Sequence, residues 1–274
     1  MLKQRIITAV LLVPLVLGVI LFAPSWLFDA VVGVALVLLS LEFAALCGLR
    51  VAGSALFAAV VTVLFALAIV PWSYAPDAGL VLLAGAAIVW LLAPLWLASR
   101  FALPAWVKLL FGLPMLAGAG FALHGLKQLD VGGTWILLAF VLVWAADIGG
   151  YAAGRAFGRH KLAPAISPGK TWEGFGGGIV LVLVIGALAA MWFVDENLWL
   201  AWAILLIVLA VFSVVGDLLE SLLKRQAGVK DSGNLLPGHG GLLDRLDSLL
   251  AVAPLFLLIG SRIGIFDELS CCGL

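Results

Sequence analysis

The 274-residue sequence is dominated by apolar residues and has no net formal charge. Hydrophobic residues make up 65% of it, charged residues make up 11%, and 15 basic residues balance 15 acidic ones. An ordinary soluble domain is closer to half apolar, so this composition excludes that class and predicts a polytopic membrane protein. The neutral balance also gives no support for nucleic-acid binding, which leaves a basic footprint.

Nine apolar segments are long enough to cross a bilayer, which requires about 20 residues each. They lie at 6–23, 27–47, 54–73, 79–98, 105–125, 133–154, 174–194, 198–219 and 247–266. The first has no small-x-small cleavage site, so we expect a retained helix rather than a removed signal peptide. We therefore predict an all-α protein with nine transmembrane helices. Five spans would form an N-terminal region, 1–125, and four spans with two polar loops a C-terminal region, 126–274.

The basic residues predict the orientation in the membrane. With a cytoplasmic N-terminus, the outer segments contain only Lys127 and Arg262. The inner segments then contain Lys3, Arg5, Arg50, Arg100, Arg155, Arg159, Lys161, Lys170, Lys224, Arg225, Lys230 and Arg245. The positive-inside rule favours this arrangement. It places the polar loops 155–173 and 220–246 in the cytoplasm, where nucleoside triphosphates are available, and the C-terminus outside.

Residues 216–248 concentrate charge between two apolar spans. If the preceding span continues as a helix, four side chains at i, i+3, i+4 and i+7 share one face. They are Asp217, Glu220, Ser221 and Lys224. A glycine-rich turn at 233–241 follows, and Asp244 and Asp247 then open the last span. Two helix ends that carry acids, joined by a glycine loop with basic residues, could hold a divalent metal and a polyphosphate together.

A second polar segment follows the sixth span. Asp147 and Tyr151 share a helix face near the end of that span. A buried aspartate costs several kcal/mol unless it is paired or metal-bound. The next loop contains Ser167-Pro-Gly-Lys170-Thr171, which lacks the second glycine and the buried strand of a P-loop. It has two interpretations: a polar turn with a helix cap, or a group of phosphate ligands.

The string Ser221-Leu-Leu-Lys-Arg-x4-Lys230-Asp-Ser-Gly-x2-Leu-Pro-Gly-His-Gly-Gly-Leu-x-Asp-Arg-Leu-Asp247 resembles the signature of the phosphatidate cytidylyltransferases, or CDP-diacylglycerol synthases, without a departure over 27 positions. Asp-x-Gly-Gly-Tyr151 and Ser167-Pro-x-Lys-Thr-x-Glu-Gly are similar to two further segments of that family. The specific resemblance covers about residues 144–250. It implies a magnesium-dependent nucleotidyltransferase of phospholipid biosynthesis that makes CDP-diacylglycerol and pyrophosphate from CTP and phosphatidic acid. It also implies a bacterial inner-membrane protein whose active site faces the cytoplasm, often a homodimer.

The resemblance and the spacing together suggest residue roles. Phosphatidate brings an ionised phosphate as nucleophile, so the reaction needs no serine or cysteine nucleophile. We expect Asp217 and Asp244 to be the main ligands of Mg²⁺ and of any second cation, with Asp147, Glu220 and Asp247 as further candidates. The basic residues expected to bind CTP phosphates or the lipid headgroup are Lys170, Lys224, Arg225, Lys230 and Arg245. Ser167, Thr171, Ser221 and His239 would add hydrogen bonds. Catalysis would rest chiefly on Asp217, Asp244, Lys224 and Arg245.

The N-terminal region carries few polar groups within its spans. Glu42 and Lys108 are the exceptions, and Glu42 has two interpretations, because an intramembrane acid can line a site or make a structural hydrogen bond. We expect His124 to be structural.

A transporter for an anionic or phosphorylated solute is the main functional alternative, because it would also place charges at interrupted helices. Such a protein would usually show internal repeats, and the first half contains no convincing repeat of the acidic motif. The Asp-Gly-x2-Ala-Arg-x8-Gly-x3-Asp-x3-Asp pattern of the CDP-alcohol phosphotransferases is absent as well.

Overall fold

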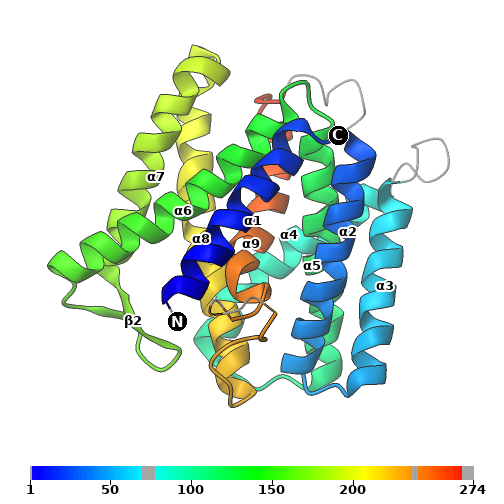
Figure 1. Cartoon of the computed structure of the whole chain (residues 1–274). Coiled ribbons are helices and arrows are strands. Elements are labelled where there is room, and N and C mark those ends of the chain that lie inside the picture. Colours follow the sequence, from blue (N-terminus) through cyan, green and yellow to red (C-terminus); the bar gives the residue numbers. More distant parts are fainter. Residues whose placement is uncertain (1, 70–77, 236–237, 239, 267–274) are drawn as a thin grey trace.

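The computed structural model describes residues 2–69, 78–235, 238 and 240–266. These residues form nine α-helices, one short 3₁₀ helix (η1) and one antiparallel β-hairpin (Figure 1). The elements are α1 (Leu2–Phe22), α2 (Ser25–Leu46), α3 (Val51–Ile69), α4 (Ala78–Ser99), α5 (Ala105–Lys127), α6 (Gly132–Phe157), β1 (Lys161–Ala163), β2 (Ser167–Thr171), α7 (Trp172–Phe193), η1 (Glu196–Leu198), α8 (Trp199–Gln226) and α9 (Leu243–Arg262). The all-α class predicted from the sequence is confirmed.

Each apolar segment predicted from the sequence overlaps one helix. Seven helical segments in the described part of the chain are long and apolar enough to cross a membrane, namely α2 to α7 and Glu196–Gln226, which includes α8. The chain is therefore an integral membrane protein. Within α1, the apolar stretch Val13–Phe22 is shorter than the seven segments above. Helix α9 carries Asp244, Arg245 and Asp247 in its first turns, so nine spans remain a prediction.

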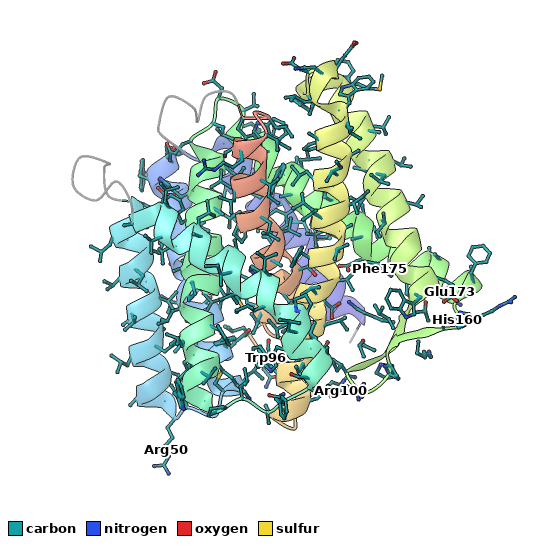
Figure 2. The ribbon with its side chains drawn as sticks, turned by 180° about the vertical axis from the view of Figure 1, so that it is seen from behind. Arg50, Trp96, Arg100, His160, Glu173 and Phe175 are labelled. Atoms are coloured by element: carbon teal, nitrogen blue, oxygen red, sulfur yellow. The ribbon has the colours of Figure 1, made fainter. Side chains whose placement is uncertain are left out.

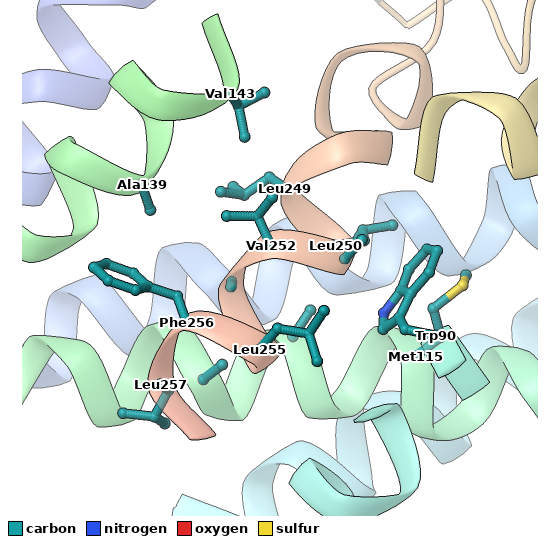
Figure 3. Close-up of a cluster of buried hydrophobic side chains, with 14 of the residues drawn as sticks. Trp90, Met115, Ala139, Val143, Leu249, Leu250, Val252, Leu255, Phe256 and Leu257 are labelled. Carbon is teal, nitrogen blue, oxygen red and sulfur yellow. The ribbon is translucent and has the colours of Figure 1, made fainter. Parts of the chain in front are cut away.

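Helix α9 lies at the centre of the core. Its residues 249–260 are apolar on every side, which is typical of a helix surrounded by others. It packs against α2, α4, α5, α6 and α8. Figure 3 shows Leu250, Leu255 and Phe256 of α9, each 5% exposed or less, among side chains that include Trp90 of α4 and Ala139 of α6. The two regions distinguished in the sequence thus share one core, while the boundary at residue 125 stays a prediction.

Small residues allow α6 and α7 to pack with their backbones in close contact. A Cβ atom on Gly149 would lie 2.6 Å from the carbonyl oxygen of Gly177, and one on Gly178 would lie 2.8 Å from that of Ala146. Between membrane helices, where lipid is as apolar as the side chains, such close approach drives association. In Figure 1, α6 runs obliquely across the bundle and α7 lies beside α8, so that the end of α6 and the start of α7 project to one side.

The polar loops gather at one end of the bundle. In Figure 1 the β-hairpin, residues 227–235 and the start of α1 lie at the lower end, whereas α9 ends at the upper one. Figure 2 shows Arg50 and Arg100 at that same lower end. The segments that were predicted to lie on one side of the membrane therefore lie at one end of the helix bundle. That this end faces the cytoplasm stays a prediction.

Gly177→Leu should lower the thermal stability of the detergent-solubilised protein, because the new side chain would overlap Ala153 and the Gly149 backbone. Overpacking of this kind costs about 1–3 kcal/mol. Gly176→Leu is the matched control, since a Cβ atom there meets nothing within 4 Å. Differential scanning fluorimetry should show a lower Tm for Gly177→Leu only, and equal Tm values for both variants and the unaltered protein would contradict the proposed helix contact.

Candidate active site

The charged face of α8 forms as the spacing predicts. Helix α8 continues to Gln226, which places Asp217, Glu220, Ser221 and Lys224 on consecutive turns. The Ser221 Oγ donates to Asp217 Oδ1 at 3.2 Å, and the Lys224 ammonium pairs with Glu220 Oε2 at 2.5 Å. One helix therefore contributes two carboxylates, a hydroxyl and an ammonium to the same side of the bundle.

A first charge cluster surrounds Asp217. The Lys170 Nζ, from strand β2, lies 2.9 Å from Asp217 Oδ2. Asp147 of α6 and Asp247 of α9 are close enough for their charges to interact with that of Asp217. Four segments that are distant in sequence thus bring three acids and one lysine together. We call Asp147, Lys170, Asp217 and Asp247 the Asp217 cluster.

The β-hairpin holds Lys170 in this position. Ile166, in the turn between the strands, is 5% exposed and packs against Leu218 and Leu222 of α8. The Arg225 Nε donates to the carbonyl oxygen of Ile166 at 3.4 Å. On the other side, Thr171 Oγ1 caps α7 by accepting a hydrogen bond from Gly174 N at 3.1 Å. The hairpin is therefore fixed to both α7 and α8.

A cavity of about 380 Å³ adjoins the Asp217 cluster. Its walls come from α6, α7, α8 and the hairpin, and they include the apolar residues Phe175, Ile179 and Val214. Its polar lining includes Asp147, Lys170 and Asp217. The cavity thus combines a charged end with apolar membrane-helix walls.

A second cluster surrounds Asp244, in the first turn of α9. Lys224 Nζ donates to Asp244 Oδ1 at 2.6 Å, so this ammonium joins Glu220 to Asp244. Asp244 Oδ2 accepts from Gly241 N at 2.8 Å and from Ser232 N at 2.9 Å. Glu220 Oε1 is buried and has no hydrogen-bond partner among the described residues. We call Glu220, Lys224, Ser232 and Asp244 the Asp244 cluster.

Both clusters lie where α8 crosses α9. A Cβ atom on Gly216 would lie 2.7 Å from the carbonyl oxygen of Asp247, so the two helices are in close contact beside Asp217. Asp244 is one turn before Asp247, and Glu220 and Lys224 follow Asp217 on α8. The charges of Glu220 and Asp247 also interact with each other, which connects the two clusters. Asp217 and Asp244 thus belong to one helix crossing, each paired with a different lysine.

Glu42 of α2 contacts the Asp244 cluster through Ser232. The sequence left two interpretations of this residue open. Glu42 is 6% exposed and accepts hydrogen bonds from Leu242 N at 3.0 Å and Leu243 N at 2.8 Å. The structure therefore assigns it structural hydrogen bonds at the start of α9. Its signal in the sequence was its isolation as an acid within an apolar span. Ser232, which also contacts Asp244, carried no separate signal.

The other predicted site residues have varied positions. Ser167 is half-buried at the start of β2, and Lys230 and Arg245 have exposed side chains. His239 lies outside the described residues. Within the described ranges, no group of three or more histidine, cysteine, aspartate or glutamate side chains is arranged to hold a metal ion by itself.

Comparison with known proteins shows the family to which the chain belongs. Residues 3–261 match the model of the cytidylyltransferase family. A phosphatidate cytidylyltransferase of Pseudomonas aeruginosa is 42% identical over 270 residues, which cover 93% of this chain and 96% of the relative. One of Haemophilus influenzae is 38% identical, with 93% of this chain and 97% of the relative covered. One of Staphylococcus saprophyticus is 54% identical over 123 residues, covering 44% and 46%. The chain belongs to the cytidylyltransferase family.

Proposed function

We propose that this membrane protein transfers the cytidylyl group of CTP to phosphatidate, producing CDP-diacylglycerol and pyrophosphate for phospholipid biosynthesis. The observation that carries the proposal is the Asp217–Lys170 pair at the charged end of a cavity with apolar walls. A phosphate ester on an apolar glycerolipid matches both parts of that cavity. The names of the relatives from Pseudomonas aeruginosa and Haemophilus influenzae point to the same reaction.

The proposed reaction is a single displacement at phosphorus. An ionised phosphate oxygen of phosphatidate attacks the α-phosphorus of CTP, and a new P–O bond forms. The bond between the α-phosphorus and the bridging oxygen breaks, and pyrophosphate leaves with the electron pair. The protein then has to align the two anions and to stabilise the charge that develops on the leaving group.

The cations of the two clusters suit this task. Lys170 lies at the cavity, and Lys224 lies between Glu220 and Asp244, so each ammonium is held by carboxylates before substrate binds. Such pairing keeps positive charge in a partly buried site without the full cost of an isolated ion. We infer that phosphate oxygens of the two substrates share these lysines with the carboxylates.

The acids present fit a magnesium ion that substrate phosphates help to bind. Mg²⁺ is usually held by one or two carboxylates together with phosphates and water, so a cage of three protein acids is not required. Glu220 Oε1 is buried without a hydrogen-bond partner among the described residues, and Asp217 is 31% exposed at its side chain. Asp244 could contribute through Oδ1, beside Lys224. A bound Mg²⁺ would supply neutralisation of the leaving pyrophosphate.

We further propose that the site faces the cytoplasm of a bacterium from the inner membrane. Both polar loops lie at the end of the bundle that carries Arg50 and Arg100 (Figure 2). The positive-inside rule assigns that end to the cytoplasm, which is also the compartment that supplies CTP.

Replacing Asp217 or Asp244 by Asn should reduce CTP- and phosphatidate-dependent release of pyrophosphate by at least about 100-fold, because each change removes a charge that organises a cluster. Asp195→Asn is the matched control, since Asp195 is exposed just before η1, away from both clusters. A coupled pyrophosphate assay measures the rates, and Tm values confirm folding. Activity within threefold of the unaltered protein in both folded variants would refute the assignment.

A cysteine placed at Val229, in the exposed loop before Ser232, should react with a membrane-impermeant maleimide only from the cytoplasmic side. The test uses a background with Cys47, Cys271 and Cys272 replaced by Ser, in right-side-out and inverted vesicles. A cysteine at Asn197, in η1 beyond the other end of α8, serves as the opposite control. Labelling of Val229→Cys from outside would reverse the proposed orientation.

A further inference from the structure

Helix α9 begins without a cap of its own. Its N-cap residue is Leu242, and no side-chain cap hydrogen bond is formed there. The first backbone N–H groups of a helix have no partner within the helix, so another acceptor must satisfy them. In a buried position, an unsatisfied N–H group costs about 1–3 kcal/mol.

Glu42 supplies the missing acceptor from α2, 200 residues earlier in the chain. Its Oε1 accepts from Leu242 N and its Oε2 accepts from Leu243 N. A carboxylate at this position also interacts favourably with the positive end of the helix dipole. The side chain is buried, so water cannot replace it easily if it is lost.

Ser232 connects this cap to the charged residues of α9. Its Oγ lies 3.0 Å from Glu42 Oε2 and 3.0 Å from Asp244 Oδ2. A hydroxyl group has one hydrogen, so it donates to one carboxylate at a time. Two acids from different helices therefore share one hydroxyl group between them.

Two glycines of the loop before α9, Gly233 and Gly241, lie close to the Glu42 carboxylate. A Cβ atom on Gly241 would lie 2.6 Å from Glu42 Oε2, and one on Gly233 would lie 2.5 Å from Oε1. Gly240, with a φ of 86°, turns the chain so that Gly241 N can donate to Asp244 Oδ2. The backbone at these glycines thus leaves room for an acid and for no further side chain.

We propose that Glu42 is a positioning residue for the reaction: by holding Ser232 and the first amides of α9, it fixes Asp244 and, through Asp244, the Lys224 ammonium. This inference rests on the proposed function, because Asp244 and Lys224 act in that reaction. Glu42 is not among the residues that line the cavity. Its effect therefore passes through Asp244, and small displacements of groups that orient substrates are costly.

The test compares Glu42→Gln and Ser232→Ala with Ser40→Ala. Ser40 lies on the same helix, is fully buried and has an Oγ without a hydrogen-bond partner among the described residues, so its loss controls for a general disturbance of α2. Glu42→Gln keeps the shape of the side chain but offers one acceptor oxygen instead of two. Kinetics with separately varied CTP and phosphatidate measure kcat and both KM values.

We expect kcat to fall about 10- to 100-fold in Glu42→Gln and about threefold or more in Ser232→Ala, with each KM within about threefold of the unaltered protein. Ser40→Ala should keep its kcat within twofold. Hydrogen–deuterium exchange provides a readout independent of activity. Amides 241–244 should exchange faster in Glu42→Gln and at the unaltered rate in Ser40→Ala.

Unchanged kcat in folded Glu42→Gln and Ser232→Ala would overturn the inference, as would unchanged exchange at residues 241–244. If Glu42→Gln does not fold, the kcat of Ser232→Ala decides, and an unchanged value would overturn the inference. An unaltered protein that releases no pyrophosphate from CTP and phosphatidate would instead refute the proposed function, and with it the catalytic role of Glu42. The exchange result would then still decide whether Glu42 holds the start of α9.

Discussion

Pairing of buried and partly buried charges at the crossing of α8 and α9 is the constraint on which the rest of the structure depends. Two lysines, Lys170 and Lys224, each contact a carboxylate at less than 3 Å within a bundle of apolar helices. For the Lys224 pairs, whose side chains are 5–13% exposed, removing one partner typically costs about 3–5 kcal/mol, because the other charge is left uncompensated. The elements that carry these residues must therefore keep their positions relative to one another. Contacts of the hairpin, of Gly241 and of Glu42 hold them in place.

The same constraint explains how the fold serves two dissimilar substrates. Helix α9 is embedded in the core, so its charged first turns are held at the depth where α8 becomes polar. The α6–α7 pair is held together by backbone contact at its glycines, and it forms the remaining walls of the cavity. The anionic headgroup of a lipid can thus meet charged residues while the acyl chains of the lipid stay beside apolar helices.

Much of this arrangement could be predicted from the sequence, because it depends on short-range periodicity. The hydropathy pattern located the nine α-helices of the described residues, and the spacing of Asp217, Glu220 and Lys224 predicted their common face. The β-hairpin was not predicted, because the strands are three and five residues long and are stabilised by contacts of Ile166 with α8. The pairing of Lys170 with Asp217 and the cap formed by Glu42 are long-range contacts, and no local pattern specifies such contacts.

Transfer of a cytidylyl group to a lipid at this helix crossing can be followed with a radioactive label. The most direct measurement incubates the purified protein in detergent with CTP labelled at its α-phosphorus, with and without phosphatidate and magnesium. We expect label to enter the organic phase only when both phosphatidate and magnesium are present, in amounts equal to the pyrophosphate released. Label that remains entirely in the aqueous phase under all conditions would show that the protein does not transfer the cytidylyl group to the lipid.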